Sequence, residues 1–292
     1  MVIVKLIGGL GNQMFQYAAS RSISLSHDVP LKLDLSWFEN VGNDTKREYE
    51  LKHLAIKEEF ASGKEIKKIA KSWGPQNIFR RFENRFLPLR RRSYITQRGT
   101  GFDPEMRRLK DNIYLDGFWS NENYFSDIRE ILMDEFQLRN PSDGVNKNMA
   151  EQLRTLNSVS IHVRRGDYVA NPVTNQYHGL CSVQYYERAI YEITQSVKDP
   201  HFFLFSDDPQ WVKDHIKISH PAVYVNHNPP AKGHEDLELM KTCKHQIIAN
   251  SSFSWWAAWL NPNPGKIIYA PARWSNKLPD NKDVIPAQWI SV

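Results

Sequence analysis

A short apolar segment that runs directly into a charged cluster most constrains the fold of this chain. Val159, Ile161 and Val163 are β-branched and alternate with other residues, which predicts a strand over 158–163. The cluster His162-Val163-Arg164-Arg165-Gly166-Asp167 begins where that strand must end. Ligands of open α/β sheets bind at the carboxyl ends of strands. Guanidinium groups there favour phosphate, because their planar fork forms paired charge-assisted hydrogen bonds. The alternative is a salt-bridged surface loop.

The second half of the chain alternates between strand-like and helix-like segments. Further strands are predicted at 201–205, 222–225, 246–249 and 266–269, and helices at 182–194, 236–243 and 253–260. This alternation indicates parallel βαβ units. The length of 292 residues suits two domains. Turn-forming residues at 140–144 predict a boundary between a domain of residues 1–144 and one of residues 145–292, with the last residues free to pack back on the first domain.

Three predicted strands of this half end in polar clusters, which a parallel sheet would bring to one edge. Arg164, after the first strand, could hold a β-phosphate and stabilise the charge on a leaving diphosphate. Asp207 or Asp208, after the second, could accept the N1 and N2 hydrogens of guanine. Ser251 and Ser252, after the third, offer donors at a helix N-terminus. Structural alternatives remain open: Asp208 and Ser252 also suit helix caps, and His162 also suits a buried histidine with satisfied hydrogen bonds.

The start of the chain contains a second candidate anion site. Residues 2–7 predict a strand, Gly8-Gly9-Leu10-Gly11-Asn12-Gln13 a glycine loop, and residues 14–25 a helix. Asp34 follows about 20 residues later, as in a dinucleotide-binding fingerprint, but Met14 occupies the position of its third glycine. A nicotinamide-dependent oxidoreductase is therefore one alternative. A tight turn that binds no ligand is another.

Composition narrows the classes of partner and compartment. A net charge of +5 suits acidic partners, namely nucleic acid, anionic lipid or a phosphorylated small molecule. The two cysteines, Cys181 and Cys243, lack metal-ligand spacing, which predicts neither a disulfide framework nor a zinc site and favours a reducing compartment. No apolar run approaches the ~20 residues of a membrane helix. The N-terminus does not resemble a signal peptide, so a cytoplasmic protein is expected.

One stretch, from Arg80 to Arg98, is basic and interleaved with Phe82 and Phe86. It favours peripheral contact with an anionic membrane over RNA binding, because no RNA-binding module accompanies it. A solvated helix face is the more ordinary interpretation. A non-catalytic phosphate or nucleic-acid binder is therefore a third functional hypothesis.

Metal dependence is not expected. Enzymes that hold a diphosphate through a divalent cation use an acidic D-x-D segment, whereas here Asp207-Asp208 is followed by Pro209 without a third ligand. Two adjacent arginines can supply the positive charge instead. We therefore predict no metal and no cofactor.

At these residues the chain resembles the bacterial α-1,2-fucosyltransferases of glycosyltransferase family 11. The resemblance covers most of the chain and rests on four segments in order, Gly8–Gln16, His162–Tyr168, Phe205–Asp208 and Ile247–Trp256. It implies a GT-B-like α/β fold, with two Rossmann-type parallel-sheet domains facing across a cleft. The N-terminal domain would be the acceptor side and the C-terminal domain would bind the GDP-sugar.

The resemblance also implies a reaction. GDP-β-L-fucose would be the co-substrate, and fucose would be transferred with inversion, without metal, to the 2-hydroxyl of a terminal galactose. That galactose would belong to an oligosaccharide or a lipid-linked glycan, and no nucleic acid would take part. The expected location is the cytoplasm, with peripheral contact at the inner membrane as a further option.

Site residues follow by position from the resemblance. Arg164 would bind the diphosphate, with Ser251 and Ser252 at the phosphate, and His162 with Asp207 or Asp208 would surround guanosine. Asn12 and Gln13 would face the donor–acceptor cleft. The other substrate-binding candidates are Gly11, Arg165, Asn250 and Phe253.

The general base is left open by the resemblance. Related core α-1,6 enzymes have a proposed glutamate shortly after the arginine motif, where this chain has Asn171-Pro172. Asp167 is the first candidate, followed by Asp34 and His178. Asp167 could instead only orient Arg164 or Arg165. A mechanism without a strong base, in which GDP departs first, is the remaining possibility.

Overall fold

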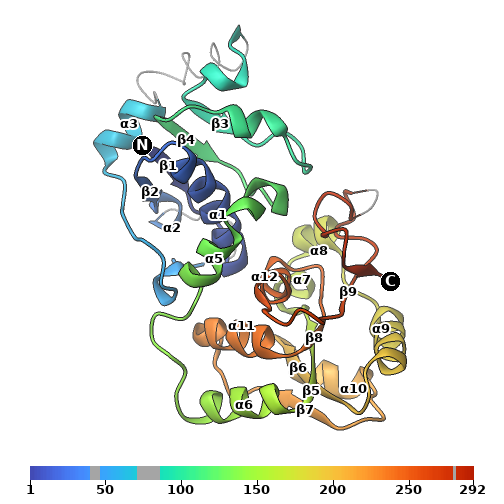
Figure 1. Ribbon diagram of the computed structural model, residues 1–292. Coiled ribbons are helices and arrows are strands. Elements are labelled where there is room, and N and C mark those ends of the chain that lie inside the picture. The colour runs from blue at the N-terminus through green and yellow to red at the C-terminus, as the bar shows by residue number, and fades with distance from the viewer. Residues whose placement is uncertain (40–46, 71–85, 279–280) are drawn as a thin grey trace. The chain divides into compact units, whose positions relative to one another are not determined.

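The chain forms two compact units, Met1–Arg139 and Asn140–Val292 (Figure 1). The computed structural model describes residues 1–39, 47–70, 86–278 and 281–292, apart from four side chains at 167, 170, 173 and 174. Each unit is built on its own parallel sheet. The predicted α/β class with two parallel-sheet units is confirmed. Residues 80–85 of the basic stretch lie outside the described residues.

The first unit has a four-stranded sheet in the order β2-β1-β4-β3. Its strands are β1 (Val2–Lys5), β2 (Leu31–Asp34), β3 (Tyr94–Thr96) and β4 (Ile113–Asp116), and its helices are α1 (Leu10–Ser26), α2 (Ser36–Glu39), α3 (Gly63–Ala70) and α5 (Arg129–Glu135). Helix α3 packs on the sheet face that presents Ile3 and Tyr114. The chain runs from β1 to β2 on one side and later adds β4 on the other side of β1.

The second unit has a six-stranded sheet in the order β10-β9-β8-β5-β6-β7. Its strands are β5 (Asn157–Val163), β6 (Pro200–Ser206), β7 (Ala222–Val225), β8 (His245–Ile247), β9 (Ile268–Ala270) and β10 (Ile290–Ser291). Its helices are α6 (Gly144–Thr155), α7 (Gly166–Ala170), α8 (Pro172–His178), α9 (Val183–Ser196), α10 (Pro209–His215), α11 (Gly233–Thr242) and α12 (Ser252–Leu260). The predicted strands over 158–163 and 201–205 correspond to β5 and β6.

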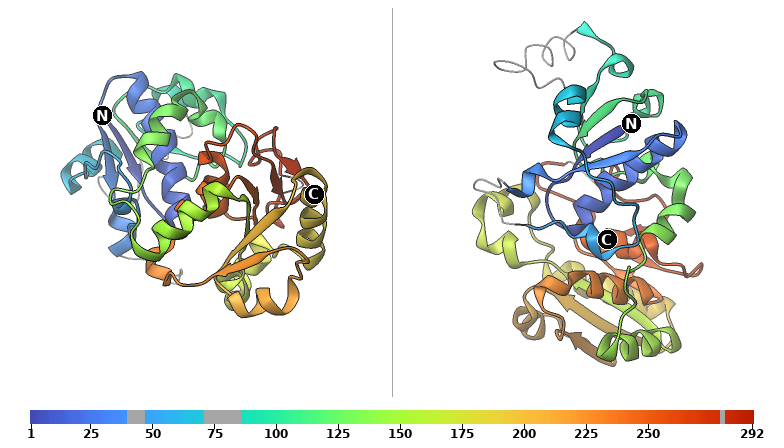
Figure 2. Two further views of the ribbon diagram at one scale, coloured as in Figure 1. Left: turned by 60° about the horizontal axis from the view of Figure 1, so that its bottom comes forward. Right: turned by 90° about the vertical axis from the view of Figure 1, so that its left-hand side faces the viewer.

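Helices cover both faces of this second sheet. Helices α6, α11 and α12 lie together on one side, whereas α9 and α10 lie on the other (Figures 1 and 2). Strands buried on both faces are apolar along their whole length, which explains the continuous run Phe202 to Phe205 in β6. No helix of the described residues is long and apolar enough to cross a bilayer.

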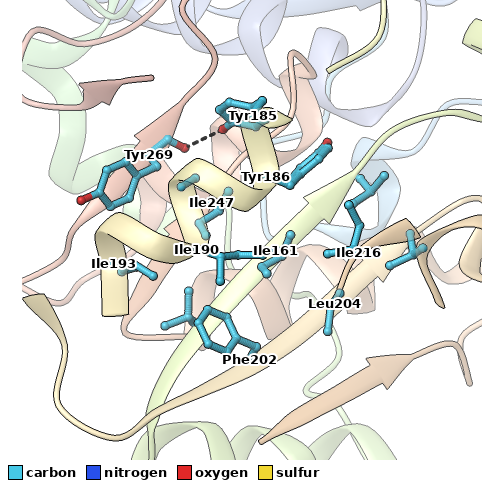
Figure 3. Close-up of a cluster of buried hydrophobic side chains, with 14 of the residues drawn as sticks. Ile161, Tyr185, Tyr186, Ile190, Ile193, Phe202, Leu204, Ile216, Ile247 and Tyr269 are labelled. Carbon is cyan, nitrogen blue, oxygen red and sulfur yellow. Dashed lines mark hydrogen bonds between the residues drawn. The ribbon is translucent and has the colours of Figure 1, made fainter. Parts of the chain in front are cut away.

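Helix α9 supplies much of the core on its side of the sheet (Figure 3). Tyr185, Tyr186, Ile190 and Ile193 recur at helical spacing and pack on strand residues such as Ile161. The Tyr185 hydroxyl donates to the backbone oxygens of Ile248 and Tyr269, at 2.6 and 3.2 Å. Burial of this polar group is therefore compensated. The same bonds fix α9 to β9 and to the end of β8, which positions the loop that follows β8.

Candidate functional site

Three strand ends of the second unit carry the predicted polar clusters to one sheet edge. Strand β5 is flanked by β8 and β6, and all three run parallel. Val163, the last residue of β5, pairs with Ser206, the last residue of β6. The residues that follow each strand, Arg164 and Asp207, are therefore neighbours. The loop after β8, with Asn250 and Ser251, leaves the sheet at the same edge.

The two adjacent arginines are each held by an aspartate from the neighbouring strand end. Arg164 Nη1 lies 2.8 Å from Asp207 Oδ2, and the Arg165 backbone N–H donates to Asp207 Oδ1 at 2.8 Å. Arg165 Nε donates to Asp208 Oδ2 at 3.3 Å, and its guanidinium lies 3.8 Å from the ring centre of Trp211. A planar guanidinium suits both contacts, since it pairs with carboxylates and stacks on aromatic faces. Both arginine side chains are thus held in defined positions.

These contacts change the role expected of Asp207 and Asp208. Asp208 Oδ1 also accepts from the Trp211 backbone N–H at 3.2 Å, which caps α10, and Pro209 occupies the first helical position. The capping interpretation of Asp208 is confirmed. All four carboxylate oxygens of the pair have protein partners. The two carboxylates position the arginines, and the quartet carries no net formal charge. Guanine recognition by Asp207 or Asp208 stays a prediction.

Gly166 allows this arrangement because a side chain would collide with it. A Cβ atom added at Gly166 would lie 2.7 Å from Asp207 Oδ2 and 3.0 Å from its Cγ. The backbone at Gly166 therefore approaches the Asp207 carboxylate more closely than it could if any residue with a Cβ atom stood at this position. Asp167 follows in α7, but its side chain lies outside the described residues, so its predicted role as base stays a prediction.

His162 is buried beside this cluster. It is 5% exposed, and its Nδ1 lies 2.9 Å from Ser254 Oγ on α12. Burial lowers the pKa of His162 to about 4, although the nearby Asp207 carboxylate acts in the opposite direction. The imidazole is therefore neutral at pH 7 and does not add positive charge for a phosphate. These contacts match a buried histidine with a satisfied partner, and its placement at guanosine stays a prediction.

The loop after β8 is organised by Asn250, which is buried. Its Nδ2 donates to the backbone oxygens of His178, Gly179 and Trp274, at 3.1 to 3.3 Å, and its Oδ1 lies 3.4 Å from the Cys181 thiol. Asn250 thus joins three loops, which is a structural role, and its predicted substrate contact stays a prediction.

Serine caps α12, but at a different residue from the one predicted. The cap is Ser251, whose hydroxyl accepts from the Phe253 N–H at 3.4 Å, whereas Ser252 is the first helical residue. The alternative interpretation of Ser252 as the helix cap is therefore wrong. The reason is that the extended backbone after β8 ends one residue earlier. Ser252 and Phe253 are only partly buried, which leaves both available for the predicted ligand contacts.

In the first unit the glycine loop is closed by the protein itself. Gln13 is fully buried, where its Nε2 donates to Gly8 O and Glu48 O and its Oε1 accepts from the Glu50 N–H, at 2.8 to 2.9 Å. The expectation that Gln13 faces a cleft is therefore wrong, because its amide joins the loop to residues 48–50. Gly11 is also buried, inside α1. Asn12 is partly exposed and stays a candidate.

A carboxylate occupies the N-terminus of α1. Glu50 Oε2 accepts from the Leu10 N–H at 2.8 Å. Burial raises the pKa of Glu50, and the Leu10 N–H opposes that rise. An anionic ligand would meet both an occupied donor and a negative charge here. The loop therefore lacks the open N-terminus that dinucleotide binding requires.

The other two candidate bases are also engaged. Asp34 is 2% exposed and accepts from the Tyr114 hydroxyl at 2.6 Å and from the Ser36 N–H at 2.9 Å. The ring of His178 stacks on the ring of Tyr168, with centres 4.9 Å apart. Both side chains already have protein partners, and the structure leaves the base unassigned.

Asp236 is a candidate that the sequence patterns did not bring forward. It lies on α11, close to the loop that follows β7, and Asn228 Nδ2 donates to its Oδ1 at 2.8 Å. Burial raises the pKa of Asp236 to about 6, and the neighbouring Glu235 acts in the same direction. Partly buried acids with shifted pKa values gather at functional sites. No local pattern in the sequence singles it out, because Asp236 lies inside α11 and not directly after a strand.

Comparison with known proteins identifies the family. The model of glycosyl transferase family 11 matches residues 76–292. The chain belongs to glycosyltransferase family 11. It is therefore a glycosyltransferase, and neither the oxidoreductase nor the non-catalytic binder is favoured. Residues 164–167, 207–208 and 250–253 lie inside the matched region, whereas the glycine loop of α1 lies outside it.

Relatives along the whole chain include two proteins of Escherichia coli. The alpha-1,2-colitosyltransferase is 34% identical, covering 100% of this chain and 99% of the relative. The O-antigen biosynthesis glycosyltransferase WbnK is 31% identical, covering 92% and 93%. Among solved structures, a NodZ alpha-1,6-fucosyltransferase soaked with GDP-fucose is 13% identical with a TM-score of 0.48, covering 89% of this chain and 92% of that one.

Proposed function

We propose that this glycosyltransferase transfers L-fucose from GDP-β-L-fucose to the 2-hydroxyl of a terminal galactose, with inversion. The observation that carries the proposal is the pair of arginines at the strand edge, held by Asp207 and Asp208 within the family match. Galactoside α-(1,2)-fucosyltransferase 1 of mouse, 28% identical over 53% of this chain, supports the linkage. The acceptor class, a galactose-terminated oligosaccharide or lipid-linked glycan, belongs to the same proposal.

In this reaction the acceptor oxygen attacks the anomeric carbon of fucose. The bond from that carbon to the β-phosphate oxygen breaks, and GDP leaves with the electron pair. Negative charge therefore grows on the β-phosphate oxygens. A guanidinium already oriented by Asp207 is suited to stabilise that charge, because little reorganisation is needed when it develops. Asp207 acts here as a positioning residue, and Arg164 as the group that contacts the leaving diphosphate.

The N-terminus of α12 supports the same phosphate site. Ser251 caps the helix and Ser252 begins it, so hydroxyl and backbone donors gather at the positive end of a nine-residue helix. Asp167 remains the proposed base for the acceptor proton, which otherwise passes to solvent after GDP has departed.

Metal independence is part of the proposal. Among the described residues no group of three histidine, cysteine or acidic side chains is arranged to hold a metal ion. We expect transfer to continue unchanged after treatment with EDTA and gel filtration. Loss of transfer in EDTA, with recovery on addition of Mg²⁺ or Mn²⁺, would contradict this part of the proposal.

Colitose is the second candidate donor sugar. The observation that favours it is the 34% identity along the whole chain with an alpha-1,2-colitosyltransferase. Colitose is L-fucose without the 3-hydroxyl, so a site that hydrogen-bonds this hydroxyl would reject GDP-colitose strongly, whereas an apolar contact there would not. The ratio of kcat/KM for the two GDP-sugars decides between the donors. We expect GDP-fucose to be preferred.

The test of the main proposal is a transfer assay with GDP-fucose over a panel of galactosides, including lactose and N-acetyllactosamine. Product linkage is determined by NMR. An α-1,2-linked fucose on galactose is the expected result. Transfer to another hydroxyl, or to none of the galactosides, would contradict it.

We also propose a cytoplasmic location with peripheral membrane contact through the 80–98 stretch. This contact is tested by sedimentation with anionic vesicles at low and high salt.

A further inference from the structure

We propose that the carboxyl edge of the first unit's sheet holds an acceptor-sugar subsite formed by Lys5, Asp116 and Phe118. The inference rests on the proposed function and names residues for its acceptor. Strands β1 and β4 lie side by side, and the chain leaves β1 for β2 on one side and returns through β4 on the other (Figure 1). In open α/β sheets this reversal point marks the ligand crevice, at the carboxyl ends of the two strands. Lys5 is the last residue of β1 and Asp116 the last residue of β4.

The acids at this edge differ in whether a carboxylate oxygen is still available to accept a hydrogen bond from a ligand. Asp34 and Glu50 are engaged by buried or backbone partners, as described above. Asp116 has a side chain that is 23% exposed, and its Oδ2 accepts from the Tyr94 hydroxyl. Among the described residues, every side-chain contact of Asp116 is made by Oδ2. Its Oδ1 atom is therefore available to accept from a ligand hydroxyl.

Lys5 is paired with Asp116 only loosely. Its Nζ lies 3.6 Å from Asp116 Oδ2, which is an ion-pair distance but too long for a hydrogen bond, and its side chain is 28% exposed. No other side-chain contact of Lys5 is found within the described part of the chain. An ammonium donor and a carboxylate acceptor thus lie next to each other at the carboxyl end of β1 and β4. A sugar hydroxyl both donates and accepts, so adjacent ring hydroxyls match this pair.

Phe118 provides an apolar surface in the loop that follows Asp116, two residues further along the chain. It is 41% exposed, although it is a large hydrophobic side chain. Its loop is held firmly: Gln97 Oε1 accepts from the Phe118 and Trp119 N–H groups, at 2.8 and 2.9 Å. A Cβ atom at Gly117 would lie 2.6 Å from the Gln97 side chain, so the loop is pressed against it. The aromatic ring is therefore presented by a fixed backbone.

An exposed aromatic ring next to a few polar groups is the composition of a small-molecule site. The ring can contact the apolar C–H face of a pyranose while Asp116 and Lys5 bind its hydroxyls. A free phosphate would not use this composition, because the carboxylate would repel it. A neutral sugar is thus the ligand class that fits, and in a galactoside fucosyltransferase that sugar is the acceptor galactose or its neighbour.

The test compares Asp116→Asn and Phe118→Ala with Asp111→Asn, which removes the same charge from an exposed position just before β4, at the opposite edge. With GDP-fucose saturating, we expect acceptor KM to rise about tenfold in Asp116→Asn and Phe118→Ala, with kcat nearly unchanged. Asp111→Asn should match the wild type. Lactose binding is followed in parallel by saturation-transfer NMR, and thermal unfolding checks folding of each variant.

The outcomes separate the subsite from the proposed function. Failure of the proposed function is seen in the wild type, as absence of fucosyl transfer. Failure of the subsite is seen in the variants, as acceptor KM and lactose binding within twofold of the wild type. A lower melting temperature with unchanged KM, or a loss confined to kcat, would also overturn it. Because Phe118 is exposed, its variant keeps the test decisive even if Asp116→Asn does not fold.

Discussion

Both units present the carboxyl ends of parallel strands, but with opposite chemistry. In the first, the helix after β1 begins at a glycine loop whose leading N–H is already bound to the Glu50 carboxylate. In the second, the strand after α6 ends in two guanidinium groups, and the helix after β8 begins with serine donors. Both edges come from parallel strands.

This difference shows that a glycine loop before a helix does not by itself make an anion site. The loop supplies backbone N–H groups, but a side chain 40 residues away decides whether they are open. In the second unit the deciding residues come from a neighbouring strand end, where Asp207 orients Arg164. Function depends on the side chains assembled at the edge, while the fold supplies only their positions.

The largest expected effect follows from removing the guanidinium of Arg164, at the carboxyl edge of the second unit's sheet. Arg164→Ala should lower kcat of transfer by about 10²–10³, the usual cost of losing one donor to developing charge. Stability should fall by less than about 1 kcal/mol, because the ion pair with Asp207 is partly exposed. Arg188→Ala, on the exposed side of α9, is the control and should be unaffected. Transfer within a factor of three of the wild type would remove Arg164 from the phosphate site.

A smaller effect is expected from displacing the carboxylate that orients Arg164. Gly166→Ala places a Cβ atom 2.7 Å from Asp207 Oδ2, so the carboxylate must shift. We expect kcat to fall about ten- to a hundredfold with little loss of stability. The Asp207 side chain can move without unfolding the protein, but Arg164 is then no longer held in the position that catalysis requires. Gly63→Ala meets no atom within 4 Å and serves as control. Equal activity of the two variants would show that the orientation of Arg164 does not matter.

Local sequence patterns predict the parts of this site that depend on neighbouring residues. Alternating β-branched residues predict β5, and Asp208-Pro209 predicts the start of α10, because strand period and helix capping act over a few residues. The pairing of Arg164 with Asp207 follows only after β6 is known to lie beside β5 in its observed register. Sheet order is set by packing of the whole unit, which no local pattern contains.

Residues that join distant segments are the ones whose contacts sequence reasoning cannot predict. Gln13 and Asn250 stand in motif-like segments next to glycine or serine, and both look like ligand contacts. Gln13 binds residue 48, and Asn250 binds residues 178, 179 and 274, far along the chain in every case. A buried amide satisfies its polar atoms wherever the fold supplies partners. Such partners are invisible before the chain is folded.

Lowering the pH should reduce the stability of the protein through His162. No effect on transfer is expected from this residue. Burial lowers the pKa of His162 to about 4, so between pH 6.5 and 4 the unfolded chain binds a proton that the folded chain does not. Stability therefore falls as pH falls through that window, by on the order of 2 kcal/mol. Melting temperatures of the wild type and His162→Gln should converge toward pH 4. His201→Gln, at the amino end of β6, should keep the wild-type profile; if it instead matches His162→Gln, burial of His162 is not the cause.

The smallest effect concerns the Glu50 carboxylate, which occupies the N-terminus of α1 in the first unit. Glu50→Ala removes the acceptor for the Leu10 N–H and should cost about 1 kcal/mol, the usual cost of losing a helix cap. Glu50→Gln keeps an acceptor oxygen and removes a buried charge whose pKa is raised by burial, but it loses the favourable interaction with the helix dipole. These terms oppose each other, so the change should stay within about 0.5 kcal/mol.

Thermal unfolding with and without NADH or inorganic phosphate measures the stability of each variant. It also shows whether the glycine loop before α1 binds an anion. Glu48→Gln, whose side chain is exposed two residues earlier, is the matched control. Neither ligand should raise the melting temperature of Glu50→Gln by more than it raises that of the wild type, since in Glu50→Gln the Leu10 N–H still has a partner. A rise produced by phosphate in Glu50→Gln alone would show that negative charge, and not the occupied donor, keeps the first edge from binding anions. The negative charge of Glu50 would then explain why the N-terminus of α1 does not bind anions, while the edge with the two arginines does.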